Sequence, residues 1–600
     1  MQNIIRLTAA INKVKPANPA ECMEGCKPLI YDRSVGDADI MVFPALSLAS
    51  PSCGNLFSSQ ILIEQSAAAL SGLQSATAGR EGYIIIGVVV GEQSAPISAI
   101  AVLSKGRIIG LLPTFDSPAP LCSGEGSSYL IPASTVFACG GLSFCVVSCD
   151  LGNLLPRMVE AAETGCELII VPSYTPAFAG QEEEVTSLIA HLSTSLGVAI
   201  AVVNGGVGDT SSPYVYRGFV SIFESGTELA YMQAGYESAS CTVDIDADII
   251  KATKKYKKVS PAFCTIQPGG QKPGLYRRVE RNPLLPSFNQ AGYLSDVFDL
   301  QARSLADRVK NIGVSRLVVG VSGGLDSTVA LLVCIRAAGY LALPRENILA
   351  VTMPGLGTSE QTHLNSGRLI QQLGVSGREI SIVRSVERHF EDIGHSGQAD
   401  VVYENAQARE RTQILLDLAN AVSGIVVGTG DLSEEALGFC TFGGDHLASY
   451  NINVCLGKTV LRELAWQLAR DGEFGDILDI VKGILETPVS PELLPTQEGE
   501  IAQKTEEIIG PYELHDFFLY YFVRYNMRPA KILHYAREAF SDMNPSFIRE
   551  MLVMFIKRFS AAQFKRSCTP DSASITTVNL SGVNYTIPSD LDPAFLLRDL

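Results

Sequence analysis

The sequence predicts an α/β protein with more than one domain, and three observations lead to this prediction. Short apolar, β-branched runs alternate with helical patterns through the first 250 residues. The alternation stops in a stretch rich in Pro and Gly, and it restarts at Leu294. Of the 600 residues, 46% are hydrophobic and only 18% are charged, which excludes a disordered chain. We therefore expect one domain over residues 1–250, a linker over 251–293 and a second domain over 294–600.

The first domain is expected to hold a sheet with helices on both faces, because its strands are almost continuously apolar. The expected strands are Ile4–Thr8, Asp39–Phe43, Tyr83–Val90, Ile97–Ser104, Arg107–Leu112, Leu142–Ser148, Glu167–Val171 and Val198–Val203. The expected helices are Gln60–Leu73, Leu154–Thr164 and Glu182–Leu196.

The second domain begins with a regular alternation of helices and strands. The expected order is a helix at Leu294–Asn311, a strand at Arg316–Val321, a helix at Ser327–Ala338, a strand at Asn347–Thr352 and a helix at Ser359–Leu373. This series is typical of βαβ units in a doubly wound parallel sheet.

Charge and cysteine usage exclude several classes of function. The 46 basic and 63 acidic residues give a net charge of −17, which argues against a nucleic-acid partner. The fourteen cysteines show no CxxC pair and no zinc-type Cys/His cluster, and most of those in the first half are expected to be apolar fillers. We read no secretory signal at the N-terminus, and the apolar stretches are shorter than the roughly 18 residues of a spanning helix. A cytoplasmic protein without a membrane partner is therefore expected.

The most informative segment is the motif SGGLDS at residues 322–327, which follows the apolar strand LVVGV at 317–321. Two glycines let backbone N–H groups close on an anion, and the helix that follows adds partial positive charge there. The hydroxyls of Ser322 and Ser327 can donate further hydrogen bonds, and Asp326 offers an oxygen ligand for Mg²⁺. The segment therefore predicts a pyrophosphate-binding loop.

Two other glycine-containing segments do not predict phosphate loops. GKT at residues 457–459 resembles the end of a Walker A motif, but position 452 is Ile rather than Gly. GTG at 428–430 lacks the third glycine of a dinucleotide-binding motif, because position 433 is Ser. Neither a P-loop NTPase nor a dehydrogenase is supported.

The SGGLDS loop resembles the signature of the N-type ATP pyrophosphatases, and further motifs narrow the resemblance. They are TMPGLGTS at 352–359, YENAQARER at 403–411, GTGDLSE at 428–434, GDH at 444–446, SPELLP at 490–495, GPYELHDF at 510–517 and QFKR at 563–566. In this order they resemble the synthetase domain of the glutamine-dependent NAD synthetase family. The resemblance covers residues 294–600 and implies a doubly wound domain of the adenine nucleotide alpha hydrolase type.

The resemblance also implies roles for individual residues. The ATP contacts would be Gly320, Val321, Ser322, Gly323, Gly324, Leu325, Asp326, Ser327, Thr429 and Lys458. The deamido-NAD contacts would be Asn405, Glu434, Phe439, Cys440, Thr441, Phe442 and Lys565, and the Mg²⁺ ligands would be Asp326 and Glu434. The implied reaction is adenylation of the nicotinate carboxylate by ATP, followed by displacement of AMP by ammonia.

Residues 1–250 resemble the other half of this family, a nitrilase-like αββα amidase that releases ammonia from glutamine through a Glu, Lys, Cys triad. The segments RLTAAI at 6–11, VFPALS at 42–47, SCGNLF at 52–57, KGRIIGLLPT at 105–114 and VVSCD at 146–150 carry this resemblance. Cys149 matches the nucleophile, but Ala45 replaces the glutamate and Thr114 replaces the lysine. Val147 and Asp150 replace two further glutamates, and the segment before the nucleophile is shortened to Asp116–Tyr129.

Without both helper residues, a thiol with an ordinary pKa is a weak nucleophile at neutral pH. Glu125 and Lys105 are considered as substitutes but are expected to be exposed loop residues. We therefore expect an inactive amidase domain and an NAD synthetase that uses free ammonia or ammonia from an external donor. Two alternatives stay open: glutamine hydrolysis through an unorthodox site, and a non-catalytic regulatory subunit. The resemblance also implies a homo-oligomer, up to an octamer.

Overall fold

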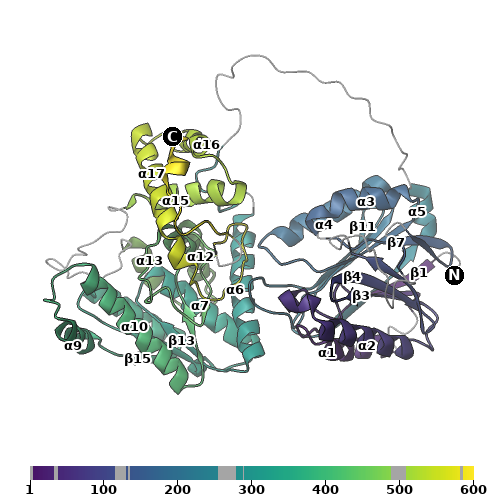
Figure 1. The fold of residues 1–600 in the computed structure, drawn as a ribbon, viewed down its shortest axis with the longest axis horizontal. Helices are drawn as coiled ribbons and strands as arrows, with labels where there is room; N and C mark the ends of the chain where they lie inside the picture. Colours follow the sequence, from purple (N-terminus) through teal and green to yellow (C-terminus); the bar gives the residue numbers. More distant parts are fainter. Residues whose placement is uncertain are drawn as a thin grey trace, which may run out of the picture. The chain divides into compact units, whose positions relative to one another are not determined.

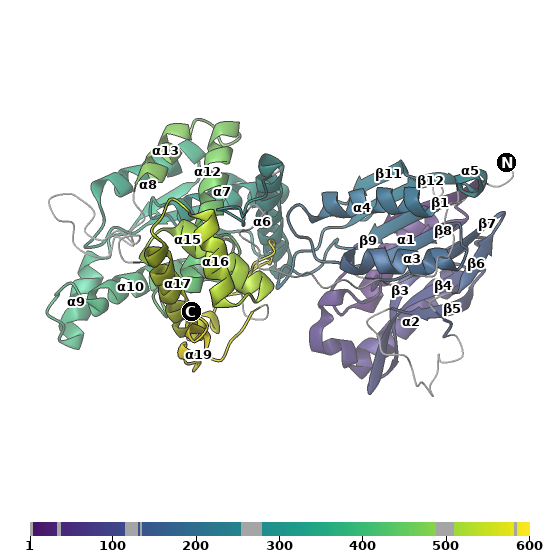
Figure 2. The same cartoon turned by 90° about the horizontal axis from the view of Figure 1, so that it is seen from above.

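The computed structural model describes residues 4–32, 38–114, 130–132, 135–149, 151–253, 279–287, 289–487, 509–580 and 585–600. The chain forms two compact units (Figures 1 and 2). Residues up to 268 make up the first unit, except for the short segments 178–180 and 211–214, which belong to the second unit with residues 269–600. Glu125, Asp150 and the shortened segment Asp116–Tyr129 lie outside the described residues.

The first unit contains two six-stranded sheets. The first sheet has the order β12-β1-β2-β3-β4-β5, and the second has the order β11-β10-β9-β8-β7-β6. The strands are β1 (Ile4–Ile11), β2 (Ile40–Val42), β3 (Tyr83–Glu92), β4 (Ala95–Ser104), β5 (Arg107–Pro113), β6 (Val136–Cys139), β7 (Leu142–Val146), β8 (Leu168–Ser173), β9 (Ala199–Asn204), β10 (Phe219–Glu224), β11 (Thr227–Gln233) and β12 (Ala239–Asp246).

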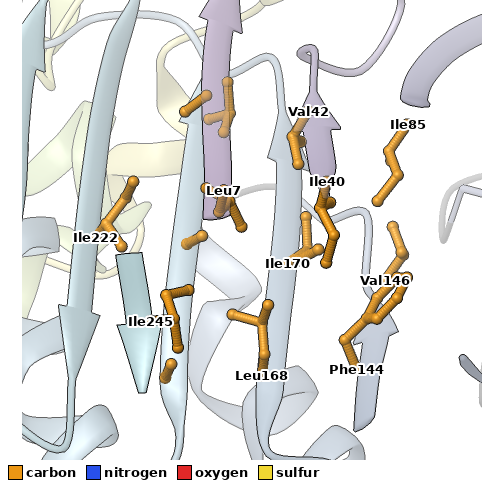
Figure 3. Close-up of a cluster of buried hydrophobic side chains, with 14 of the residues drawn as sticks. Leu7, Ile40, Val42, Ile85, Phe144, Val146, Leu168, Ile170, Ile222 and Ile245 are labelled. Atoms are coloured by element: carbon orange, nitrogen blue, oxygen red, sulfur yellow. The ribbon is translucent and has the colours of Figure 1, made fainter. Parts of the chain in front are cut away.

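The two sheets pack face to face through one apolar core, and helices cover their outer faces. Figure 3 shows Leu7, Ile40 and Val42 of the first sheet facing Val146 and Ile170 of the second. The covering helices are α1 (Pro19–Tyr31) and α2 (Gln60–Ala76) on the first sheet and α3 (Leu154–Glu163) and α4 (Gln181–Leu196) on the second, while the short α5 (Ala247–Thr253) follows β12 (Figures 1 and 2). This arrangement confirms the expected αββα sandwich.

Strand β3 shows why the strands of this unit read as continuous apolar runs. Successive side chains of a strand point to opposite faces of the sheet. Ile85 contributes to the core between the sheets, whereas Ile84, Ile86 and Val88 pack under the covering helices. Because both faces are buried, no polar alternation is left in the sequence.

Helix α1 is one of several elements that the sequence reading did not include. Its start carries ordinary signals, since the Asn18 side chain accepts a hydrogen bond from the Glu21 amide and Pro19 occupies the first helical position. Pro28 inside the helix is the opposing signal, because proline normally interrupts a helix. The strands β6, β10 and β11 were also absent from the prediction.

The second unit is built on a five-stranded parallel sheet of order β15-β14-β13-β16-β17. Its strands are β13 (Leu317–Gly320), β14 (Ile348–Thr352), β15 (Ser376–Glu379), β16 (Ile425–Gly428) and β17 (Tyr450–Asn451). The strand order reverses at β13, whose two neighbours are β14 and β16. Ligands of doubly wound folds bind at the carboxyl ends of strands at such a switch point, and the SGGLDS loop follows β13 there.

The helices of the second unit surround this sheet and form an additional C-terminal layer. They are α6 (Gln290–Ile312), α7 (Leu325–Tyr340), α8 (Glu360–Leu373), α9 (Val383–Ile393), α10 (Val401–Ala421), α11 (Leu432–Leu437), α12 (Lys458–Asp471), α13 (Leu478–Glu486), α15 (Tyr512–Leu519), α16 (Pro529–Ala539), α17 (Pro545–Ala561), α18 (Gln563–Arg566) and α19 (Ala594–Leu597). Among the described residues, no helix is both long and apolar enough to span a membrane.

Candidate functional site

The glycine loop after β13 has the backbone geometry of a close-packed turn. Gly323 has a φ of +85°, and a Cβ atom at this position would lie 2.3 Å from the carbonyl oxygen of Thr362. The Ser322 hydroxyl oxygen accepts a hydrogen bond from the Gly324 amide at 3.2 Å and lies 3.2 Å from the Ser327 hydroxyl oxygen. The loop therefore needs glycine at position 323, and it brings two hydroxyls together at the start of α7.

Helix α7 begins directly at this loop, with Gly324 as its N-cap residue. A helix N-terminus presents backbone N–H groups and the positive end of the helix dipole, which together favour an anion. The two serine hydroxyls at the same place can donate to phosphate oxygens. The predicted pyrophosphate-binding function of the loop is therefore compatible with its geometry.

The loop opens into a cavity of about 330 Å³. The cavity is lined by the sheet edge, the loop and seven helices, α7, α8, α10, α11, α12, α13 and α15. The lining includes residues 320–327, Thr352, Met353, His363, Arg411, Thr429, Glu434, Phe439, Asp445, Lys458 and Tyr512. All ten residues predicted to contact ATP are in this lining. Of the residues predicted to contact deamido-NAD, Glu434 and Phe439 are also in it.

A buried cluster of one ammonium and three carboxylates lies in the wall of the cavity. The Lys458 Nζ atom is 2.9 Å from Asp326 Oδ1, 2.5 Å from Asp431 Oδ2 and 3.0 Å from Glu434 Oε1. Asp326 is on α7, Glu434 is on α11, and Lys458 is the first residue of α12. Three carboxylates and one ammonium carry a net charge of −2 when all are ionised, so the cluster attracts a further cation.

Burial and mutual repulsion perturb the titration of this cluster. Burial raises the pKa of Glu434 to about 7, against the opposing effect of Lys458. Burial likewise raises the pKa of Asp431 well above its ordinary value. For Lys458, burial alone would lower the pKa, but the surrounding carboxylates outweigh it and raise the pKa. The Lys458 ammonium is therefore charged, whereas Glu434 and Asp431 bind a proton more readily than ordinary carboxyl groups.

Four of the remaining predicted deamido-NAD contacts form a second cluster around the loop that follows α11. The Thr441 hydroxyl donates to Asn405 Oδ1 at 2.9 Å. The Lys565 ammonium donates to the carbonyl oxygens of Gly438 at 2.8 Å and Cys440 at 2.6 Å. The structure thus brings Asn405 of α10 and Lys565 of α18 into contact with the loop that carries Cys440 and Thr441.

The fifth remaining residue, Phe442, belongs to an exposed aromatic group on the same loop. Its ring centroid lies 5.5 Å from those of His446 and Phe564, and its carbonyl oxygen accepts hydrogen bonds from Arg409. Phe442 and Phe564 are 44% and 47% exposed, although they are large apolar side chains. Exposed aromatic faces of this kind can stack on a base or a pyridine ring.

Two site residues were missing from the sequence prediction. Asp431 is fully buried, and it caps α11 in a reciprocal capping box with Glu434. The spacing of an Asp followed three residues later by a Glu was a visible signal for this cap. The Tyr512 ring centroid lies 5.5 Å from Lys458 Nζ in a cation–π contact, and its side chain lines the cavity. Nothing local in the sequence connects Tyr512 to Lys458.

In the first unit, the three positions of the amidase triad follow the carboxyl ends of β2, β5 and β7. Ala45 is 6% exposed and belongs to the apolar core between the two sheets. The Thr114 amide donates to the carbonyl oxygen of Ser98 at 2.8 Å. Cys149 is 7% exposed, and its carbonyl oxygen accepts a hydrogen bond from the Ser173 hydroxyl at 3.2 Å.

Most of the other described cysteines in this unit are buried as well. They are Cys22, Cys26, Cys53, Cys145 and Cys166, whereas Cys139 and Cys241 are partly exposed. Their burial agrees with the expected role as apolar fillers. Lys105, which was considered as a substitute for the missing lysine, pairs with Glu81 at 2.6 Å on the surface.

The sequence matches one protein-family model and several known proteins. Residues 298–554 match the family model described as NAD synthase. The chain is 29% identical over 605 residues to the glutamine-dependent NAD(+) synthetase of Mycobacterium tuberculosis, covering 90% of this chain and 89% of that protein. It is 28% identical over 668 residues to the protein of the same name from Mycobacterium leprae, covering 100% and 98%.

Two solved structures share the fold over nearly the whole chain. The glutamine-dependent NAD(+) synthetase of Cytophaga hutchinsonii has a TM-score of 0.75 at 14% identity and covers 99% of both chains. The glutamine-dependent NAD+ synthetase of Acinetobacter baumannii, solved in complex with ADP, has a TM-score of 0.64 at 17% identity and covers 97% of this chain and 98% of its own. At these identities the likeness concerns the fold.

Proposed function

Because this chain belongs to the NAD synthetase family and is a ligase that forms a carbon–nitrogen bond, we propose that it converts deamido-NAD to NAD with ATP and ammonia. The observation that carries this proposal is the cluster of Lys458, Asp326 and Glu434 in the cavity opened by the SGGLDS loop. Such a site can bind the phosphates of ATP and stabilise the charge that develops when pyrophosphate leaves.

The first step is adenylation. An oxygen of the nicotinate carboxylate attacks the α-phosphorus of ATP, a new oxygen–phosphorus bond forms, and the bond from that phosphorus to pyrophosphate breaks. Backbone N–H groups at the start of α7 and the hydroxyls of Ser322 and Ser327 hold the leaving pyrophosphate. The Lys458 ammonium compensates negative charge on the phosphates.

The second step is amide formation. Ammonia attacks the carbonyl carbon of the acyl-adenylate, the carbon–oxygen bond to AMP breaks with its electron pair on AMP, and one ammonia proton is lost to water. Neither step needs a covalent bond to the protein, so positioning and electrostatics carry the catalysis.

The cluster also suits Mg²⁺, which prefers carboxylate oxygens. Oxygen atoms of Asp326, Asp431 and Glu434 lie within 4.8 Å of one another, and when all three carboxyl groups are ionised their charge exceeds that of Lys458 by two. We propose Asp326 and Glu434 as the ligands. A bound Mg²⁺ would supply charge neutralisation to the phosphates of ATP.

We assign deamido-NAD to the second cluster. Lys565, fixed by two carbonyl oxygens, can meet a phosphate or carboxylate group of this dinucleotide. Asn405 can hydrogen-bond a ribose or a base, and the residues 439–442 provide backbone groups and the exposed Phe442 ring for stacking.

We further propose that the nitrogen donor is ammonia, free or delivered by an external donor. Support comes from the first unit, where Ala45 offers no base and Thr114 no cation to activate Cys149. An unassisted thiol with a pKa near 8.5 is only a few per cent ionised at neutral pH.

The second candidate is a glutamine-dependent reaction at an unorthodox amidase site. It is favoured by the names of the relatives from Mycobacterium, which are called glutamine-dependent and match the chain over both units. A third possibility, a regulatory subunit without activity, is disfavoured because the charged residues of the nucleotide cavity are all in place.

A comparison of nitrogen donors tests these candidates. NAD formation would be measured with deamido-NAD, ATP and Mg²⁺ and with either glutamine or ammonium chloride, in the wild type and in Cys149→Ala. We expect activity with ammonium that is equal in both proteins and little activity with glutamine. Glutamine-dependent activity that disappears in Cys149→Ala would establish the second candidate, and no NAD with either donor would refute the synthetase function.

We also propose that the protein is a homo-oligomer, up to an octamer, as in the family. Light scattering coupled to size-exclusion chromatography measures the mass directly. A species at the 64.3 kDa of one chain would contradict this proposal.

A further inference from the structure

The N-terminus of α12 is capped by side chains from two other helices. Its own N-cap residue, Gly457, has no side chain, so the first amides of the helix need acceptors from elsewhere. The Lys458 amide donates to the Ser433 hydroxyl oxygen at 2.8 Å, and the Thr459 amide donates to Asp516 Oδ2 at 3.0 Å. Ser433 is on α11 and Asp516 is on α15.

The Asp516 carboxylate connects these three helices. Its Oδ1 atom accepts a hydrogen bond from the Ser433 hydroxyl, and its Oδ2 atom accepts from the Thr459 hydroxyl at 2.6 Å in addition to the Thr459 amide. Asp516 is 1% exposed, so these bonds are not shared with bulk water. A carboxylate at a helix N-terminus is also favoured by the helix dipole.

The Asp516 carboxylate and the Leu284 side chain pack closely against Gly457. A Cβ atom on Gly457 would lie 2.8 Å from Asp516 Oδ2 and 2.6 Å from Leu284 Cδ1. Separations under 3.0 Å require something to shift, so glycine at position 457 lets the carboxylate approach the helix start.

The first residue of the capped helix α12 is Lys458, whose ammonium lies in the wall of the cavity opened by the SGGLDS loop. The Lys458 Nζ atom contacts the three carboxylates described above. Tyr512, one helical turn before Asp516 on the same face of α15, places its ring 5.5 Å from the same ammonium. Helix α15 therefore contacts the Lys458 side chain through Tyr512, and through Asp516 it binds the adjacent Thr459 amide and the Ser433 hydroxyl that accepts from the Lys458 amide.

We propose that Asp516 is a positioning residue for the adenylation step: by capping α12 from outside, it fixes the Lys458 ammonium at the phosphates of ATP. This inference rests on the proposed function, since it assigns Lys458 a role in the reaction. A displacement of about 1 Å at a reacting centre can lower a rate about a hundredfold. The loss of one cap is therefore expected to reduce turnover more than it reduces substrate affinity.

The test is a double-mutant cycle on pyrophosphate exchange into ATP that depends on deamido-NAD, which reports adenylation without any nitrogen donor. The variants are Asp516→Asn, Lys458→Met and the double variant, each in the full chain. We expect Asp516→Asn to lower the exchange turnover by about 10- to 100-fold, with a KM for deamido-NAD close to that of the wild type. In the Lys458→Met background, Asp516→Asn should lower the turnover little further, because its effect passes through Lys458.

A merely structural role gives a different pattern, in which Asp516→Asn lowers turnover by the same factor with and without Lys458. That result would overturn the proposal. Exchange by Asp516→Asn at the wild-type rate would overturn it as well. If the wild type itself shows no exchange, the proposed function fails, and the role of Asp516 fails with it. Asp471→Asn, at the exposed end of the same helix, is the matched control and should exchange like the wild type.

A second variant covers the case that Asp516→Asn does not fold. Thr459→Val keeps the shape and the amide at position 459, but it removes the hydroxyl that donates to Asp516. We expect Thr459→Val alone to lower the exchange turnover several-fold, and to lower it little further in the Lys458→Met background. An additive loss in this cycle would also overturn the proposal.

Discussion

The backbone at Gly323 provides the sharpest test of the phosphate loop. In Gly323→Ala, the new methyl group would lie 2.3 Å from the Thr362 carbonyl oxygen and 2.9 Å from Thr362 Cγ2. The residue would also have to keep a φ of +85°, which glycine tolerates and alanine does not. The loop must therefore move, and it carries the proposed phosphate ligands with it.

The magnitude follows from two separate costs. A left-handed conformation costs a residue other than glycine roughly 1–2 kcal/mol. Overpacking against a fixed backbone typically costs about 1–3 kcal/mol more. If the loop moves away in the free protein, ATP binding must restore it at a combined cost of roughly 2–5 kcal/mol. At about 1.4 kcal/mol per factor of ten, the ATP affinity then falls by between roughly 30-fold and several thousandfold.

Isothermal titration calorimetry with ATP and Mg²⁺ measures this loss. Gly313→Ala is the matched control, because Gly313 has a φ of +73° but no atom within 4 Å of the added Cβ, and it lies outside the cavity lining. This control should lose roughly 1–2 kcal/mol of stability and keep its ATP affinity. Equal ATP affinities of Gly323→Ala and Gly313→Ala would refute the reasoning.

Buried charges and a tight glycine in the second unit give three further predictions. Burial raises the pKa of Glu434 to about 7, and Mg²⁺ binds the ionised carboxylate. The Mg²⁺ affinity measured by calorimetry should therefore fall as the pH drops from about 8 to about 6, by up to roughly tenfold per pH unit. A Mg²⁺ affinity that stays constant over this range would contradict the prediction. Gly457→Ala should lower the turnover of pyrophosphate exchange about tenfold or more by pushing the Asp516 carboxylate away from α12, and wild-type turnover would show that this contact is unimportant. Arg566→Met should lower the free energy of unfolding in urea by about 2–4 kcal/mol, because the buried Arg566 guanidinium donates to four oxygen atoms. Arg549 is exposed, so Arg549→Met should change this free energy by less than about 0.5 kcal/mol. Similar losses in the two variants would contradict the prediction.

The phosphate loop could be predicted from sequence because its causes are local. An apolar strand, two glycines and a helix start occupy twelve consecutive residues, 317–328, and each dictates its own backbone conformation. The doubly wound sheet around it followed from the same kind of pattern. The structure places these elements within a few residues of the expected bounds, as in β14 (Ile348–Thr352) against the expected Asn347–Thr352.

The charged cluster is a different case, because its members meet only through the fold. Lys458 and Asp326 are 132 positions apart, and Asp516 is 57 positions from Thr459. Residue patterns give no reason to pair them, so Lys458 was assigned through the family resemblance alone. Asp431 was missed for the opposite reason, because its local role as a helix cap gives no sign of its contact with Lys458.

Weak or conflicting local signals explain why the edge strand β11 and helix α1 were missed in the first unit, whereas the internal strand β10 was missed although it is buried along its whole length. Strand β11 (Thr227–Gln233) lacks a continuous apolar run, since it lies at the edge of its sheet and exposes Thr227, Glu228 and Gln233. Burial on both faces, which made the central strands easy to recognise, is absent at an edge.

The first unit keeps an apolar core at the position where the family resemblance implies a catalytic glutamate. A buried glutamate at position 45 would have to be desolvated, which costs free energy unless it is paired. Ala45 instead adds an apolar side chain to the core between the sheets. The backbone there remains closely held, since a Cβ on Gly87 would lie 2.0 Å from the Leu46 amide nitrogen. The fold of the first unit therefore does not need a glutamate at position 45, and the comparison of nitrogen donors with Cys149→Ala decides whether this unit hydrolyses glutamine.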